Sequence, residues 1–237
     1  MLPAHRIFAA VDTTGTEEAS ALIGSLAGSV GGIKLGLEFF VARGPDGIRA
    51  AMGGTGLPLF LDLKLHDIPN TVAGAVRAAV PLAPAFLTLH ASGGLAMMRA
   101  ARDAAQDAAA RAGVAPPRLL AVTVLTSLDD ADLGRVGQAG PAADQVVRLA
   151  ALAAEAGIDG IVCSPAEVAE QRRRHGPGFV LMVPGIRPAG SDVGDQKRVM
   201  TPREAVEAGA DYLVIGRPIT QAADPAAAAR AIVGSLS

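Results

Sequence analysis

The sequence of 237 residues has a single cysteine, Cys163, no tryptophan, and only 3% aromatic residues. One cysteine excludes both an internal disulfide and a zinc site built from several thiolates, which is typical of proteins from a reducing cytoplasm. We therefore expect a cytoplasmic protein. Cys163 follows Ile161 and Val162, so we interpret it as a small apolar residue at a strand end rather than as a nucleophile.

An excess of charge of one sign is also lacking. The 21 Lys and Arg residues and the 23 Asp and Glu residues give a net charge of −2. Without a basic stripe or aromatic stacking platforms, nucleic acid is not an expected partner. No apolar run approaches the roughly 18 residues that a transmembrane helix needs. The first residues, MLPAHRIFAAVD, also lack the apolar region of a secretory signal, so we expect no membrane partner.

The stretch LFLDLKLHDIPNTV, residues 59–72, sets charged side chains into an otherwise apolar strand. Because side chains alternate along a strand, Asp62 and Lys64 are predicted to share one face, with Asp67 just past the carboxyl end. Ligands of parallel α/β proteins bind at that end. A buried ion pair that holds the strand in register would explain one Asp and one Lys. Two carboxylates against one ammonium would destabilise a purely structural site, so these three residues are candidates for catalysis.

Short apolar strands alternate with helical patterns along the whole chain. Strands are predicted at residues 6–12, 32–35, 59–65, 85–90, 118–125, 159–163, 178–183 and 211–215. No break in composition separates one part of the chain from another. Eight such units predict an α/β fold in which residues 1–237 form a single (β/α)8 TIM barrel. A doubly wound open sheet is the alternative, but the first turn, DTTGTEE, lacks its glycine-rich fingerprint.

Polar residues follow several of the other predicted strands. Asp12 closes the first strand, and Lys34 lies near the end of the second, where it could equally be a surface lysine. Thr126 and Ser127 follow the fifth strand; their hydroxyls suit a polar ligand, and they equally suit a turn or a helix cap. His90 ends the fourth strand, and we assign it no role in proton transfer. The helix after residue 65 is expected to be capped by Asn70 or Thr71.

The connection PGIRPAGSDVGDQKRVMT, residues 184–201, is longer than an ordinary loop between a strand and a helix. We interpret it as a functional lid that carries Arg187 and Gln196. Barrels often bind phosphate with the loops after strands seven and eight, and the eighth is followed by Gly216 and Arg217. A glycine lets the backbone approach an anion, and an arginine can chelate two of its oxygens. These four residues form a predicted phosphate site.

The motif DLKLHDIPNT at residues 62–71 resembles the signature of the orotidine 5′-phosphate decarboxylase family. VPGIRP, GDQKR and IGRPI resemble the phosphate-side motifs of the same family, and the resemblance covers nearly the whole chain in the expected order. It implies a (β/α)8 barrel that converts orotidine 5′-monophosphate into uridine 5′-monophosphate and CO2, a step of pyrimidine nucleotide synthesis. It also implies that no metal or organic cofactor is used and that the protein is a homodimer.

The resemblance also implies roles for individual residues. Lys64 is the proton donor to pyrimidine C6, and Asp62 lies beside the departing carboxylate. Asp67, with Thr71 nearby, is supplied to the active site of the partner subunit. Further residues would contact the rest of the substrate: on the ribose side Asp12 and Lys34, at the pyrimidine Thr126 or Ser127, and at the phosphate Arg187, Gln196, Gly216 and Arg217.

Two other enzymes of the same barrel remain alternatives, a sugar-acid-phosphate decarboxylase and a phosphosugar epimerase. Both usually require a metal, and the 4 histidines do not cluster in the sequence. A phosphate-binding barrel without catalytic activity is a third alternative. It is disfavoured because Asp62, Lys64 and Asp67 are all present.

Overall fold

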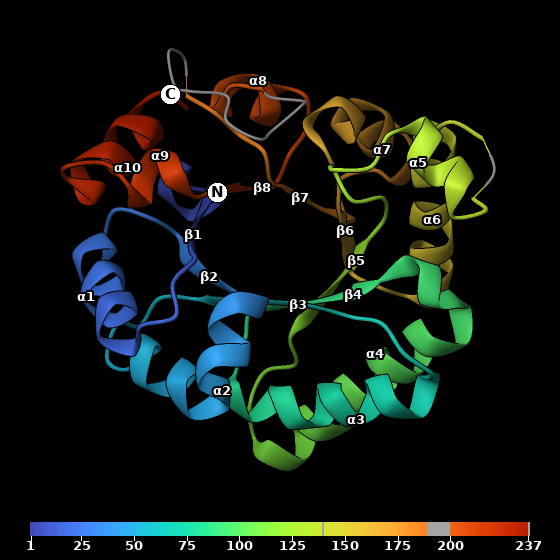
Figure 1. Ribbon diagram of the computed structural model, residues 1–237, viewed down its shortest axis with the longest axis horizontal. Helices are drawn as coiled ribbons and strands as arrows, with labels where there is room; N and C mark the ends of the chain where they lie inside the picture. The colour runs from blue at the N-terminus through green and yellow to red at the C-terminus, as the bar shows by residue number, and fades with distance from the viewer. Residues whose placement is uncertain (139, 189–199, 237) are drawn as a thin grey trace.

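The computed structural model describes residues 1–138, 140–188 and 200–236. Its strands are β1 (Ile7–Val11), β2 (Gly32–Gly36), β3 (Leu59–Leu65), β4 (Phe86–His90), β5 (Arg118–Val122), β6 (Gly160–Val162), β7 (Val180–Val183) and β8 (Tyr212–Ile215). Each strand pairs in parallel with its neighbours, and β8 pairs with β1 to close the ring at the centre of Figure 1. The predicted (β/α)8 barrel is confirmed.

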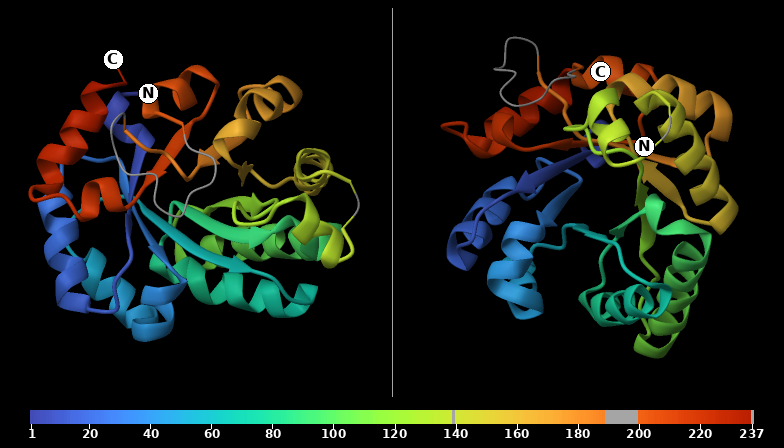
Figure 2. Two further views of the ribbon diagram at one scale, coloured as in Figure 1. Left: turned by 45° about the horizontal axis from the view of Figure 1, so that its top comes forward. Right: turned by 45° about the vertical axis from the view of Figure 1, so that its right-hand side comes forward.

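Helices surround this ring of strands on all sides (Figures 1 and 2). They are α1 (Thr16–Leu26), α2 (Leu37–Met52), α3 (Pro69–Ala79), α4 (Gly94–Ala112), α5 (Asp130–Arg135), α6 (Ala142–Ala156), α7 (Val168–His175), α8 (Pro202–Glu207), α9 (Arg217–Thr220) and α10 (Pro225–Gly234). Short 3₁₀ helices are η1 (Pro3–Arg6), η2 (Val80–Leu82), η3 (Ala91–Gly93) and η4 (Pro165–Glu167). α10 packs against α1 and η1, so the last helix closes the outer layer beside the first.

Two apolar cores hold the layers together. The larger core lies between strands and helices and contains fully buried residues such as Ile33, Leu61 and Leu181. The second core fills the barrel interior; its members are Phe8, Ala10, Phe60, Phe86, Leu120, Val180, Met182 and Val214. The interior of this barrel is therefore packed with side chains and is not a pore.

Four rings, those of Phe8, Phe60, Phe86 and Tyr212, meet edge to face inside the barrel, and we call them the aromatic layer. Their centroid separations run from 5.0 Å for Phe86 and Tyr212 to 6.2 Å for Phe8 and Phe60. Gly32 provides the space for this layer, because a Cβ atom at that position would lie 2.2 Å from a ring carbon of Phe8.

The start of α3 differs from the prediction. Neither Asn70 nor Thr71 caps this helix, because it begins at Pro69 with Ile68 at the N-cap position and no side-chain cap. Proline suits the first helical position since its missing N–H would have no partner there. The residue before, Asp67, accepts a hydrogen bond from the backbone N–H of Ile68 at 2.6 Å instead.

Within the described ranges we find no helix with the length and hydrophobicity that crossing a bilayer requires.

Candidate active site

Four charged side chains, three on β2 and β3 and one directly after β1, form a chain of alternating sign at the carboxyl end of the barrel. The Lys34 Nζ lies 3.2 Å from Asp12 Oδ1 and 3.9 Å from Asp62 Oδ2. The Lys64 Nζ lies 2.7 Å from that same Oδ2 atom of Asp62. Parallel pairing between the strands produces this arrangement. Ala10, two residues before Asp12, pairs with Lys34, and Gly36, two residues after Lys34, pairs with Asp62. We call these four residues the charge chain.

The backbone of Lys64 has an unusual conformation. Its φ angle is 50°, in the left-handed region that residues other than glycine rarely adopt. The pairing between β3 and β4 also shifts register between Leu61 and Leu65. Regular alternation along β3 therefore ends before Lys64, and a local backbone distortion helps to aim its side chain.

Thr88 on β4 holds this distortion in place. Its hydroxyl donates a hydrogen bond to Asp62 Oδ1 at 2.9 Å and accepts one from the Lys64 backbone N–H at 2.9 Å. Thr88 is fully buried. Sequence reasoning missed this residue, although it lies two positions before His90 in a strand where alternate residues face inward.

Burial differs along the charge chain. The side chains of Lys34 and Asp62 are each 12% exposed, whereas that of Lys64 is 30% exposed. Both carboxylate oxygens of Asp62 are engaged, one by Thr88 and the other by the ammonium of Lys64. An ammonium has three donors, so Lys64 keeps donors that can reach a ligand.

A cavity of about 180 Å³ opens beside Lys34, Asp62 and Lys64. The rest of its wall is mostly apolar, from Phe60, Val122, Val124, Leu125, Thr126, Val162, Cys163, Pro184 and Val214. Among the described residues, Thr126 is the one hydroxyl residue in this lining, whereas Ser127 is exposed and does not line it. Burial raises the pKa of the Cys163 thiol, which keeps it protonated and agrees with its interpretation as an apolar residue.

Asp67 and Thr71 do not join the charge chain of their own subunit. Both are exposed, and the side chain between them in sequence, Ile68, is 67% exposed. Of the three charged residues predicted together, the structure brings together Asp62 and Lys64 and leaves Asp67 facing outward.

The predicted phosphate residues lie on the two loops after β7 and β8. The backbone N–H of Arg187 donates to the carbonyl of Met200 at 3.0 Å, so the two ends of the long connection are tied together. Gly216 occupies the N-cap position of α9, and Arg217 is the exposed first residue of that helix. Gln196 lies outside the described residues.

His90 lies next to the charge chain and 5.3 Å from the ring of His66, measured between centroids. Burial lowers the pKa of His90, and the charges of His66 and Lys64 lower it further, while Asp62 opposes the shift. His90 is therefore held in its neutral form. Among the described residues, no three His, Cys, Asp or Glu side chains are grouped to hold a metal ion.

The barrel and this site together define a class of protein. Charged groups at the carboxyl ends of barrel strands, beside an enclosed apolar cavity, are the arrangement of (β/α)8 barrel enzymes. Residues 5–232 match the model of the orotidine 5′-phosphate decarboxylase / HUMPS family, and the chain belongs to this family.

Individual relatives agree with this assignment. The chain is 59% identical over 230 residues to the orotidine 5′-phosphate decarboxylase of Rhodospirillum rubrum, which covers 97% of this chain and 93% of the relative. It is 53% identical over 230 residues to the enzyme of the same name from Thermobifida fusca, covering 97% and 95%. The crystal structure of orotidine 5′-phosphate decarboxylase from Lactobacillus acidophilus superposes with a TM-score of 0.84 at 38% identity, covering 98% of each chain.

Proposed function

We propose that this chain decarboxylates orotidine 5′-monophosphate to uridine 5′-monophosphate and CO2. The observation that carries the proposal is the charge chain of Asp12, Lys34, Asp62 and Lys64, which opens onto an apolar cavity. Family membership supports the same reaction, since the curated relatives bear the name of this activity.

The cavity suits a flat pyrimidine ring. Its apolar wall excludes water from the ring faces, and Thr126 supplies a hydroxyl for a polar edge of the base. Thr126 is therefore the better candidate for the pyrimidine contact than Ser127, which lies outside the lining. Asp12 and Lys34, at the end of the charge chain away from Lys64, would contact the ribose hydroxyls.

The chemical step needs a stabiliser for negative charge on carbon. When the bond between C6 and the carboxylate breaks, CO2 leaves and the electron pair stays on C6. The ammonium of Lys64 is held 2.7 Å from Asp62 Oδ2, so a positive charge is already in place beside the position where the negative charge develops. Lys64 then transfers a proton from Nζ to C6 and regains one from water.

Asp62 has a second effect on the substrate. Its carboxylate is kept in place by Thr88 and Lys64, so a substrate carboxylate bound beside it would be repelled. Loss of CO2 removes that repulsion before the proton is transferred. We give this effect less weight than the electrostatic stabilisation by Lys64.

Phosphate binding would add to the same step from a distance. Arg187, Gln196, Gly216 and Arg217 would hold the phosphate, and the connection at residues 184–201 would close over the substrate as a lid. Binding energy at the phosphate would then contribute to stabilising the transition state at C6.

A homodimer would complete each site. Asp67, Ile68 and Thr71 are exposed on the chain that carries them, and an exposed carboxylate flanked by an exposed apolar side chain suits a contact between subunits. Asp67 of one subunit would add a second carboxylate beside the Lys64 ammonium of the other.

The reaction is tested with purified protein in EDTA, by following loss of the orotate absorbance and identifying the product. We expect conversion to uridine 5′-monophosphate by the wild type and none by Lys64→Ala. Arg49→Ala serves as the matched control, since Arg49 is an exposed cation paired only with Asp46. Folded wild-type protein that converts sugar-acid phosphates with magnesium instead would contradict the proposal.

Phosphate recognition has its own test. Arg217→Ala should weaken binding of uridine 5′-monophosphate much more than binding of uridine, as measured by calorimetry. Equal weakening of both ligands would remove Arg217 from the phosphate site.

Subunit sharing is tested by mixing inactive variants. Lys64→Ala and Asp67→Ala are each expected to be inactive. An equal mixture that exchanges subunits should regain about one quarter of the wild-type activity, because half of the dimers are hybrids with one intact site each. A mixture that stays inactive while hybrid dimers form would place Asp67 in its own subunit's site.

A further inference from the structure

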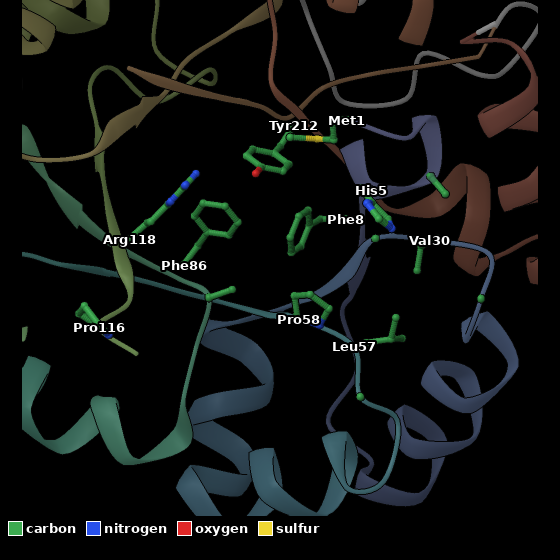
Figure 3. Close-up of a pocket in the computed structure, with 15 residues that line it drawn as sticks. Met1, His5, Phe8, Val30, Leu57, Pro58, Phe86, Pro116, Arg118 and Tyr212 are labelled. Carbon is green, nitrogen blue, oxygen red and sulfur yellow. The ribbon is translucent and has the colours of Figure 1, made fainter. Parts of the chain in front are cut away.

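A large opening into the barrel interior lies at the end opposite the charge chain. It is a cavity of about 670 Å³ whose walls come from the loops before several strands (Figure 3). Its lining is Met1, Ala4, His5, Phe8, Gly28, Val30, Gly31, Gly56, Leu57, Pro58, Ala85, Phe86, Pro116, Arg118 and Tyr212. We propose that this cavity, which we call the amino-end pocket, binds a small aromatic anion.

The walls of the amino-end pocket suit a flat apolar body. The rings of Phe8 and Phe86 lie side by side in its centre, and that of Tyr212 lies beside them (Figure 3). Pro58 and Leu57 line another part of the wall. Aromatic ligands pack well against ring edges and faces arranged in this way.

The charged residues in the lining indicate that the ligand carries a negative charge. Of the residues that the structure describes, no Asp or Glu lines the pocket, whereas Arg118 does. In the part of the chain that the structure describes, the guanidinium of Arg118 has neither a hydrogen bond nor an ion pair with another residue. An unpaired guanidinium beside an apolar wall favours a carboxylate, which it can bind through two hydrogen bonds.

Two carboxylates lie near Arg118 and accept hydrogen bonds from other residues. Asp159 accepts a hydrogen bond from the Leu119 backbone N–H at 2.8 Å. Asp211 accepts one from Arg172 at 2.6 Å. Both line an adjoining hollow whose wall also includes Arg118, and neither lines the amino-end pocket.

The amino-end pocket is separate from the candidate active site. Phe8 and Phe86 line the pocket, whereas Phe60, which packs against both rings, lines the cavity at the charge chain. The aromatic layer therefore stands between the two cavities, and the proposal does not depend on the reaction at the other end.

The sequence provides a local reporter for this pocket. Tyr212 is the single tyrosine, and the chain has no tryptophan, so the intrinsic fluorescence of the protein arises in the pocket wall. Naphthalene-2-carboxylate is a suitable probe, with the neutral naphthalene-2-carboxamide as its uncharged partner. N-acetyltyrosinamide in solution corrects for the light that each probe absorbs.

We expect the carboxylate to quench the fluorescence of Tyr212 saturably, with a dissociation constant that calorimetry reproduces. The carboxamide should bind about tenfold more weakly, because it lacks the charge that strengthens the contact with Arg118. Arg118→Gln should remove this preference and Arg118→Lys should keep most of it. Arg111→Gln is the control, because Arg111 is an exposed cation of the neighbouring helix α4 that does not line the pocket.

Three outcomes would overturn the proposal. These are no saturable binding to the wild type, equal affinity for the two probes, and a preference that survives Arg118→Gln. Displacement of the probe by uridine 5′-monophosphate would also overturn it, because the probe would then lie at the charge chain. If uridine 5′-monophosphate fails to bind at all, the proposed reaction is in doubt while the amino-end pocket is not.

Discussion

Thr88 is the residue whose replacement tests the site most directly. Thr88→Val keeps the side-chain shape and removes the hydroxyl that joins Asp62 Oδ1 to the Lys64 backbone N–H, each at 2.9 Å. Both partners then lose a hydrogen bond; Thr88 itself is fully buried, whereas the side chains of Asp62 and Lys64 are 12% and 30% exposed. Two buried groups left unsatisfied would cost roughly 1–3 kcal/mol each. Because both residues keep some exposure, we expect the free energy of unfolding to fall by about 2–4 kcal/mol, in the lower part of the summed range.

The effect on catalysis should be larger than the effect on binding. Without the hydroxyl, the left-handed backbone at Lys64 loses a restraint and Asp62 can rotate. A displacement of about 1 Å costs on the order of 10²-fold in rate. Thr88 does not line the cavity, so kcat for orotidine 5′-monophosphate should fall about 100-fold while KM changes little.

Two variants make the Thr88 experiment decisive. Thr88→Ser keeps the hydroxyl and should retain most of kcat. Thr123→Val removes another buried threonine hydroxyl. This hydroxyl donates a hydrogen bond of 3.3 Å to the Val162 carbonyl and does not contact the charge chain. This replacement should lower stability without lowering kcat. Wild-type kcat in Thr88→Val, or equal losses in Thr88→Val and Thr123→Val, would refute the reasoning.

Other residues give further predictions. Lys64→Gly should be inactive yet about 1 kcal/mol more stable than Lys64→Ala in urea unfolding, because glycine adopts a φ of 50° without strain; equal stability would argue against backbone strain. Arg172→Met should lower the free energy of unfolding by about 3–5 kcal/mol, because it leaves partly buried Asp211 and several carbonyls without their donor; a loss below 1 kcal/mol would contradict this. The pKa of His90 is lowered from 6.5 in the fold, so the unfolded chain binds the proton more readily and stability should fall as the pH drops below 6.5. His90→Gln should flatten this fall between about pH 7.5 and about pH 5.5, and an unchanged slope would exclude the contribution of His90.

The barrel could be predicted from the sequence because the patterns that indicate its strands and helices are local. Each strand is a short apolar run that ends in a glycine, a proline or a polar residue, and the order of strands and helices leaves few topologies. The predicted ends were less accurate: β5 stops at Val122 although the apolar run continues to Leu125. Apolar residues alone do not show where pairing between strands ends.

The charge chain was only partly predictable. Asp62 and Lys64 lie two residues apart in one strand, so period-two alternation predicted that they share a face, although a local distortion at Lys64 is what brings them together in the structure. The contact of Asp62 with Lys34 depends on the register between β2 and β3, which one sequence does not show. The positive φ of Lys64 and the link through Thr88 depend on the irregular pairing of β3 with β4. The position of Asp67 could not be settled from one chain, because it faces outward.

The aromatic layer also determines from which end of the barrel a molecule can reach the charge chain. Four rings fill the barrel between its two ends, so nothing passes along the axis from one cavity to the other. The aromatic layer therefore closes the site at the charge chain toward the amino end of the barrel. The substrate, CO2 and nucleotide of the proposed reaction would therefore enter and leave at the carboxyl end of the barrel.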